Sequence, residues 1–325
     1  MAIPKTTALH FLFAAFVSFY LSTAMTTLLF LRVASKWPRL MRDIIESSLD
    51  KYIDMEVKSK LVFRSTLFLT LAFVEHILSC NTKIIAAYLC PEENSTLYKN
   101  FIDLSFPWYA QLELPFYSVT GLFLQFLNIT STINWSYSDV FIICMSYYIT
   151  SILRQINRTI IEAEKKYYQP SFWAALREDY TRACRLVSSF DDAISGIMFC
   201  SFATNLFFIC LQLFYVFSPF YGYENFIYFV FSFVFVLGRF LAVSLKASCI
   251  HTEALATAPA LYNLPSTVYC VEIQRFLEQV HGNTVALTGL QFFYVTKSLL
   301  LTVAGTIITY ELVLIQFNGE SPEHV

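Results

Sequence analysis

Residues 114–153 have the sequence LPFYSVTGLFLQFLNITSTINWSYSDVFIICMSYYITSIL, in which Asp139 is the only charged side chain. This apolar run is about twice as long as one membrane-spanning helix needs. The whole chain of 325 residues is 56% hydrophobic and 14% charged, whereas soluble domains carry about 25% charged residues. With 8 Gly, 10 Pro and a net charge of −2, collagen-like, disordered and nucleic-acid-binding classes are excluded. The composition predicts an all-α, polytopic helical membrane protein.

Six stretches are long and apolar enough to cross a bilayer, whose interior offers no water to satisfy the backbone. They are 8–31, 61–80, 114–153, 193–218, 225–248 and 287–317. We interpret the first as a retained helix rather than a signal peptide. Its apolar run is longer than the usual about 7–15 residues, and it ends in a basic stop formed by Arg32, Lys36, Arg39 and Arg42.

The distribution of basic residues predicts the orientation of these crossings. Segments 32–64 and 154–192 hold eight and seven Lys or Arg, whereas 81–113 holds two. The positive-inside rule places the first two segments in the cytosol and 81–113 outside. Because an odd number of crossings leads from outside to inside, 114–153 is predicted to be one long helix. The expected topology has six crossings, with both ends of the chain outside.

Outside the crossings, the sequence predicts one modification and no catalytic chemistry. Asn94 lies in a glycosylation sequon within a polar outer loop and is predicted to carry a glycan. Cys80 and Cys90 flank the same loop, and their spacing is equally consistent with a disulfide and with two free thiols. No metal-ligand, nucleophile or nucleotide motif occurs. We therefore expect no enzyme, no metal and no cofactor.

Segments 154–192 and 249–286 have the apolar periodicity of amphipathic helices. We expect the third, fourth and fifth membrane helices to extend into the cytosol and to pack there with a separate helix near 267–281. Pro170 is predicted to break the chain between the third and fourth helices. The alternative is helices lying on the membrane surface, where near-balanced charges would gain little from anionic lipid.

The last apolar stretch carries a polar stripe. An α-helix turns by about 100° per residue, so the members of the stripe fall within about 40° of one line along the helix surface. Phe317 falls within about 60° of the same line. The members are Thr302, Thr306, Thr309, Val313 and Gln316. Along the helix, three hydroxyl side chains are followed by one apolar side chain and one amide. This order is typical of a water-lined path that is closed by a hydrophobic constriction. Packing of the Thr residues against a neighbouring helix is the alternative.

Two motifs resemble those of a known family. The sequence TYELVLIQF at 309–317 resembles the TYhhhhhQF motif that ends insect gustatory receptors, and the Glu after Tyr resembles their sugar (sweet-taste) branch. WSYSD at 135–139, followed by an apolar run and RQIN at 154–157, is similar to the family's fourth helix. Family members have seven helices and a cytosolic N-terminus, so by this resemblance the chain lacks the first transmembrane helix.

The resemblance implies a ligand-gated, non-selective cation channel in the plasma membrane of a sensory neuron. It would be a homo- or hetero-tetramer with sister gustatory receptors and would pass monovalent and divalent cations. By motif position Val313, Gln316 and Phe317 resemble the gate. The chain would then comprise a ligand-binding bundle (1–248, with cytosolic extensions at 154–192), a cytosolic anchor region (249–286), a pore-lining helix (287–317) and an extracellular tail (318–325).

Polar side chains inside the crossings are costly in a bilayer and therefore mark a cavity or a partner. We predict an outward-opening sugar pocket, in which carboxylates and amides bind hydroxyls and an aromatic ring covers the pyranose. Its residues are Glu75, His76, Trp135, Asp139, Asn205, Gln212 and Tyr228, with Asp139 the first candidate. Alternatively, Glu75 and His76 pair with each other, and Asn205 and Gln212 bond between helices. Arg239 is predicted to pair with an acid or a carbonyl.

Two other functions remain open from the sequence. A cation-coupled secondary transporter would use Glu75 or Asp139 for coupling, although the halves of the chain show no repeat of the kind many transporters have. A G-protein-coupled receptor is opposed by the charge distribution, which leaves the C-terminus outside.

Overall fold

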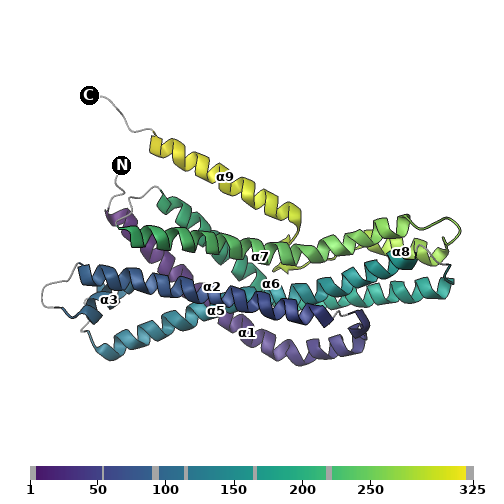
Figure 1. The fold of residues 1–325 in the computed structure, drawn as a ribbon, viewed down its shortest axis with the longest axis horizontal. Helices are drawn as coiled ribbons and strands as arrows, with labels where there is room; N and C mark the ends of the chain where they lie inside the picture. Colours follow the sequence, from purple (N-terminus) through teal and green to yellow (C-terminus); the bar gives the residue numbers. More distant parts are fainter. Residues whose placement is uncertain are drawn as a thin grey trace.

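The computed structural model describes residues 5–52, 55–89, 95–112, 116–163, 167–216 and 222–319. Five long helices run along the long axis of an elongated bundle (Figure 1). They are α1 (Lys5–Ser47), α2 (Met55–Leu89), α5 (Ser118–Ala163), α6 (Pro170–Val216) and α7 (Tyr223–Tyr262). All five are long and apolar enough to cross a membrane. They contain the described parts of the first five predicted crossings, and α5 is continuous, which confirms the single long helix.

Shorter elements connect the long helices. A 3-10 turn, η1 (Asp50–Tyr52), follows α1, and α3 (Leu97–Ser105) and α4 (Pro107–Ala110) cover one end of the bundle. At the opposite end lies α8 (Val271–Gly282). A hairpin of β1 (Thr288–Gly289) and β2 (Phe293–Tyr294) then leads into α9 (Lys297–Gly319).

The end of the bundle that carries α8 is a packed helical body, as the amphipathic periodicity predicted. Trp173 and Tyr180 of α6 and Phe276 of α8 are almost fully buried in its core, and the separate helix expected near 267–281 is α8. Arg154 pairs with Glu253 between α5 and α7, with 2.7 Å between Nη2 and Oε1. Helices that bury one another in this way are not lying on a membrane surface.

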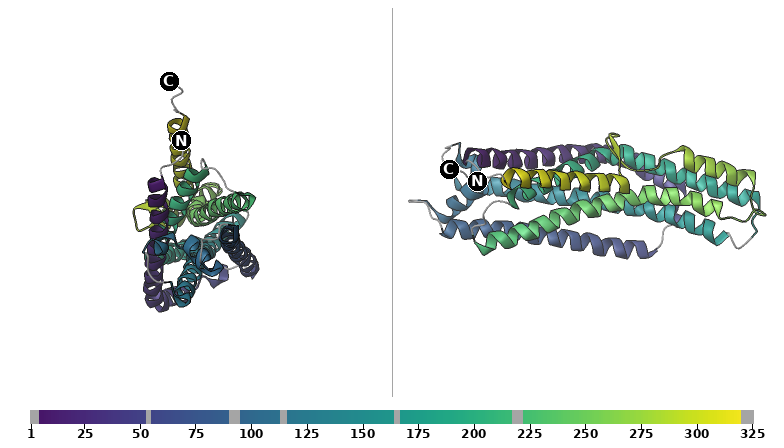
Figure 2. Two further views of the ribbon diagram at one scale, coloured as in Figure 1. Left: turned by 90° about the vertical axis from the view of Figure 1, so that its left-hand side faces the viewer. Right: turned by 90° about the horizontal axis from the view of Figure 1, so that it is seen from above.

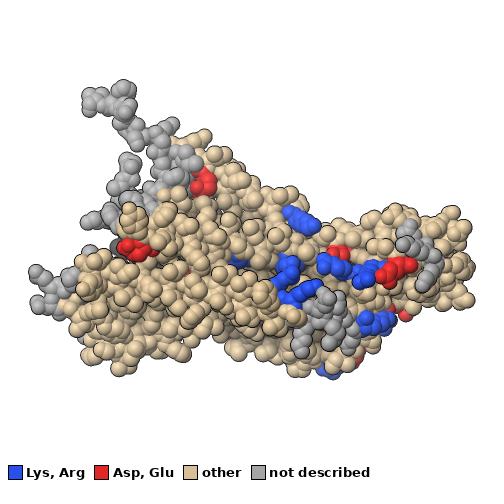
Figure 3. Space-filling view, in the orientation of Figure 1, with Lys and Arg blue, Asp and Glu red and all other residues tan. Residues whose placement is uncertain are grey.

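Charged side chains divide the long axis into two halves. On the face shown in Figure 3, Lys and Arg gather from the middle of the molecule toward the α8 end, and the other half shows only small acidic patches. Large apolar side chains such as Leu28 of α1, Phe73 of α2 and Leu122 of α5 are exposed. This distribution is consistent with a membrane-spanning half that carries few charges.

The prediction that one crossing covers 287–317 is wrong at its start. Residues 288–294 form the β1–β2 hairpin, in which Leu290 and Gln291 adopt positive φ of 50° and 62°. Hydropathy could not separate this segment from the helix, because Leu287 and Val295 are apolar and fully buried. The helix itself, α9, begins at Lys297 and projects from the bundle (Figures 1 and 2).

The hairpin is fixed to α6 by polar and aromatic contacts. Oδ1 of Asp191 accepts a hydrogen bond from the backbone N of Thr288 at 2.6 Å, and Oδ2 accepts one from Thr288 Oγ1 at 2.8 Å. Leu290 N donates to Ser195 O at 3.3 Å. The ring of Phe293 lies 5.6 Å from that of Phe202. The base of α9 is therefore attached to the same helix that reaches the membrane half.

Candidate functional site

A cavity of about 280 Å³ lies within the membrane half, between α1, α2, α5, α6 and α7. Five of the seven predicted ligand residues line it: Glu75, His76, Trp135, Gln212 and Tyr228. Phe19, Phe208 and Phe235 supply apolar wall. A concave, largely apolar cavity with a few polar groups is the usual form of a small-molecule site.

One face of α2 supplies the charged wall of this cavity. Glu75, His76, Ser79 and Lys83 all line it, because residues four apart lie on the same side of a helix. Ser79 and Lys83 were not predicted from the sequence. Counting four and eight residues onward from Glu75 would have found both.

The Glu75 carboxylate is held by groups from α7 rather than by its neighbour His76. Its Oε1 accepts hydrogen bonds from Tyr228 OH at 3.3 Å and from Ser232 Oγ at 3.1 Å. Gln212 Nε2 of α6 donates to the same Ser232 Oγ at 3.0 Å. His76 Nε2 instead lies 3.8 Å from Cys80 Sγ. This chain of bonds joins α2, α6 and α7 around the cavity.

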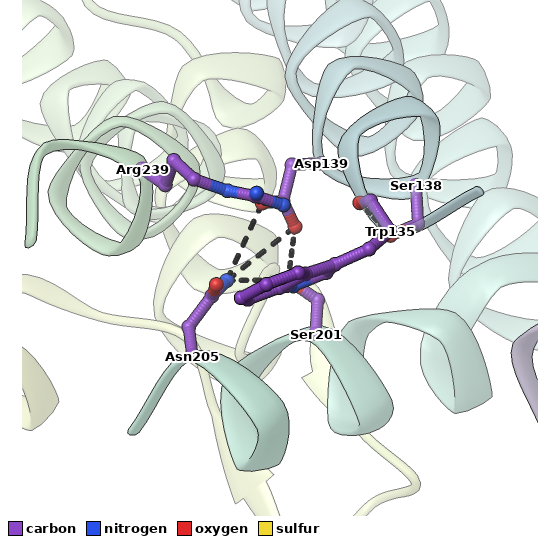
Figure 4. A network of polar contacts seen from close by, with 6 residues as sticks. All are labelled: Trp135, Ser138, Asp139, Ser201, Asn205 and Arg239. Carbon is purple, nitrogen blue, oxygen red and sulfur yellow. Dashed lines mark hydrogen bonds and ion pairs between the residues drawn. The ribbon is translucent and has the colours of Figure 1, made fainter. Parts of the chain in front are cut away.

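Asp139 and Asn205 are not on the cavity wall, contrary to the prediction. Asp139 is fully buried, and Arg239 donates to its Oδ2 from Nε at 2.9 Å and from Nη2 at 2.7 Å. Ser201 donates to Oδ1 at 2.6 Å, and Asn205 Nδ2 lies 3.4 Å from both carboxylate oxygens (Figure 4). A buried carboxylate needs such partners. The pairing of Arg239 with an acid was expected from the sequence.

Trp135 stacks on the arginine of this ion pair at the cavity wall. The guanidinium carbon of Arg239 is 4.1 Å from the centroid of the Trp135 ring, a cation–π contact, and both residues also line the cavity. Asp139 therefore fixes Arg239, and Arg239 supports the aromatic wall.

Two polar atoms on the cavity residues lack a hydrogen-bond partner within the described chain. They are Trp135 Nε1, a donor, and Gln212 Oε1, an acceptor. Buried polar atoms are normally bonded, so these two atoms are the polar groups of the cavity residues that the described chain leaves unsatisfied. No group of His, Cys, Asp and Glu among the described residues is arranged to hold a metal.

On α9, the members of the predicted stripe whose side chains are described, Thr302, Thr306, Thr309, Val313 and Gln316, are exposed in the protomer. The three Thr hydroxyls donate to the carbonyls of residues four positions earlier. The protomer-facing side is instead formed by Leu299, Leu300, Val303 and Ile307, which pack against the main core. Packing of the stripe against its own bundle is therefore excluded.

Three predicted features lie wholly or partly outside the described residues. The Phe317 backbone belongs to α9, but its side chain is not described. Asn94 and Cys90 are outside the described ranges. Cys80 is a free thiol among the described residues.

Comparisons with known proteins agree with this architecture. A family described as "Trehalose receptor" matches residues 5–324. The gustatory receptor for sugar taste 64f of Drosophila melanogaster is 36% identical over 307 residues, covering 92% of this chain and 65% of that relative. The gustatory receptor 5a for trehalose of the same organism is 33% identical over 312 residues, covering 94% and 69%.

Solved structures of the insect olfactory receptor OR5 from Machilis hrabei have the same fold. The structure without ligand gives a TM-score of 0.66 and the complex with eugenol gives 0.65, each at 17% identity and each covering 93% of this chain and 80% of that chain. The fold is thus that of a multi-pass helical membrane protein. The chain belongs to the insect gustatory receptor family, in its sugar receptor branch, which confirms the resemblance carried by its terminal motif.

Proposed function

We propose that this chain is a subunit of a sugar-gated, non-selective cation channel in the plasma membrane of a sensory neuron. The supporting observation is the cavity. Glu75, Gln212 and Trp135 line it with an acid, an amide and an aromatic ring. Such groups bind the hydroxyls and the apolar face of a sugar. The related receptors for sugar taste and for trehalose support the same ligand class.

In this proposal α9 lines a central pore in a tetramer, formed either by copies of this chain or with sister receptors. Its stripe of Thr hydroxyls, Val313 and Gln316 is exposed in the single protomer, as a surface that meets water or other subunits must be. Val313, Gln316 and Phe317 form the gate through which monovalent and divalent cations pass. The cytosolic region 249–286 holds the subunits together, the 318–325 tail is extracellular, and Asn94 carries a glycan.

The transporter alternative is less well supported by the geometry. Asp139 is fully buried and bonded to Arg239, Ser201 and Asn205, so it offers no free carboxylate for a coupling ion. Among the described residues, Glu75 is the one acid on the cavity wall, and its Oε1 already accepts two hydrogen bonds.

Recording current from cells that express the chain, alone and with a sister gustatory receptor, tests this function. A panel of sugars is expected to evoke cation currents with resolved single-channel openings. Currents of transporter size without such openings would contradict the channel. An epitope tag after Val325, stained on intact cells, tests the outside C-terminus. Staining only after permeabilisation would favour the G-protein-coupled receptor.

A further inference from the structure

Lys83 is a basic residue on the cavity wall. It lies on α2, lines the cavity together with Asn128 and Thr132 of α5, and is partly buried. The described residues include none that forms a hydrogen bond or an ion pair with its ammonium group. By contrast, Arg239, the other cation lining the cavity, is paired with Asp139.

Glu75, the acid on the same wall, attracts Lys83 electrostatically but forms no ion pair with it among the described contacts. Glu75 is eight residues earlier on α2, about 12 Å along the helix axis. Its Oε1 accepts from Tyr228 and Ser232. The two ends of this helical face thus differ in charge, with a hydrogen-bonded carboxylate at one end and, at the other, a lysine without a hydrogen-bond partner among the described residues.

A partly buried cation without a partner is unfavourable unless something of opposite charge binds there. Near Lys83, the Asn128 amide lines the cavity and can donate a hydrogen bond to a carboxylate. The Thr132 hydroxyl instead donates to Asn128 O at 2.9 Å, and the Ser79 hydroxyl bonds Tyr228. Farther along the lining, Glu75, Gln212 and Tyr228 offer polar groups to the hydroxyls of a ligand. The cavity therefore combines an anion-binding end with a hydroxyl-binding end.

We propose that this cavity binds sugar acids, meaning sugars that carry a carboxylate, and that Lys83 is the residue that selects the carboxylate. The inference rests on the proposed function, in which the same cavity binds sugars. Glu75 fixes the orientation, because a ligand bound the other way round would place its carboxylate against a like charge. Neutral sugars use the hydroxyl-binding end and depend little on Lys83.

Ligand binding is measured on the purified full chain, through the rise in melting temperature caused by glucuronate or by glucose. Lys83→Met is expected to raise the glucuronate concentration needed for half of the shift by about 10- to 100-fold, the loss of one charged hydrogen bond. The same variant should change the glucose requirement less than about threefold. Lys83→Arg keeps the charge and should retain glucuronate binding. Lys99→Met, on α3 and not on the cavity wall, is the matched control.

The outcomes separate this inference from the proposed function. Glucose binding without glucuronate binding in the unsubstituted chain overturns the sugar-acid inference alone. An equal loss of both ligands in Lys83→Met also overturns it, because Lys83 would then bind hydroxyls or stabilise the fold. Binding of both sugars with no evoked current in cells overturns the channel but leaves the sugar-acid inference standing.

Discussion

Arg239 donates two hydrogen bonds to the same oxygen of Asp139, from Nε at 2.9 Å and from Nη2 at 2.7 Å. The pair joins α7 to α5 within the membrane half, and both side chains are almost completely buried. Because Arg239 also contacts the ring of Trp135, the pair links the stability of the bundle to the shape of the cavity wall.

Removing one member of this pair should destabilise the protein. Asp139→Asn leaves the Arg239 cation without its counter-charge, and breaking a buried pair costs about 3–5 kcal/mol. We expect a lower melting temperature in detergent. The double variant Asp139→Leu, Arg239→Met removes both charges and should be more stable than Asp139→Asn. If Asp139→Asn weakened sugar binding at unchanged stability, Asp139 would contact the ligand directly.

Glu75→Gln should weaken sugar binding without unfolding the chain. The amide oxygen can still accept from Tyr228 and Ser232, but a bond to an ionised acceptor is stronger by about 1 kcal/mol. The sugar concentration for half-maximal current is therefore expected to rise about fivefold. Glu224→Gln, on α7 but not on the cavity wall, serves as the control. Equal shifts in both variants would argue against a specific contact.

Gln316→Ala should change ion flow rather than sugar affinity. In the proposed pore, the Gln316 amide lies next to the apolar constriction at Val313, so its removal is expected to alter basal leak or single-channel conductance. Leu312→Ala is the control, because Leu312 is exposed on α9 but lies off the stripe. Wild-type conductance in Gln316→Ala would mean that the stripe does not face the pore.

Asp191→Asn should weaken the attachment of the β1–β2 hairpin to α6. Its two oxygens accept from Thr288 N and Thr288 Oγ1, and the amide can replace only one of these acceptors. We expect a smaller maximal current at an unchanged half-activating sugar concentration. The adjacent Asp192→Asn is the control, because Asp192 is 71% exposed and forms a surface pair with Lys36, which is worth about 1 kcal/mol at most. Similar effects of both variants would exclude a specific role for the hairpin.

The length of the apolar runs and the distribution of basic residues were sufficient to predict α5 as one long helix, and amphipathic periodicity predicted α8. The cost of polar side chains in a membrane also identified Glu75, His76, Trp135, Gln212 and Tyr228 as residues of one cavity. It failed for Asp139, because sequence shows a charge in a membrane helix but not whether a partner such as Arg239 covers it. The hairpin was missed since an apolar segment buried on α6 has the same composition as one buried in lipid.

The helices that build the cavity do not include α9, which is attached to α6 through a short hairpin. Substitutions that adapt the cavity to a new nutrient therefore fall on other segments than those facing the proposed pore. In the proposed channel, such a division would let gene duplicates diverge in what they detect while they inherit the same electrical response.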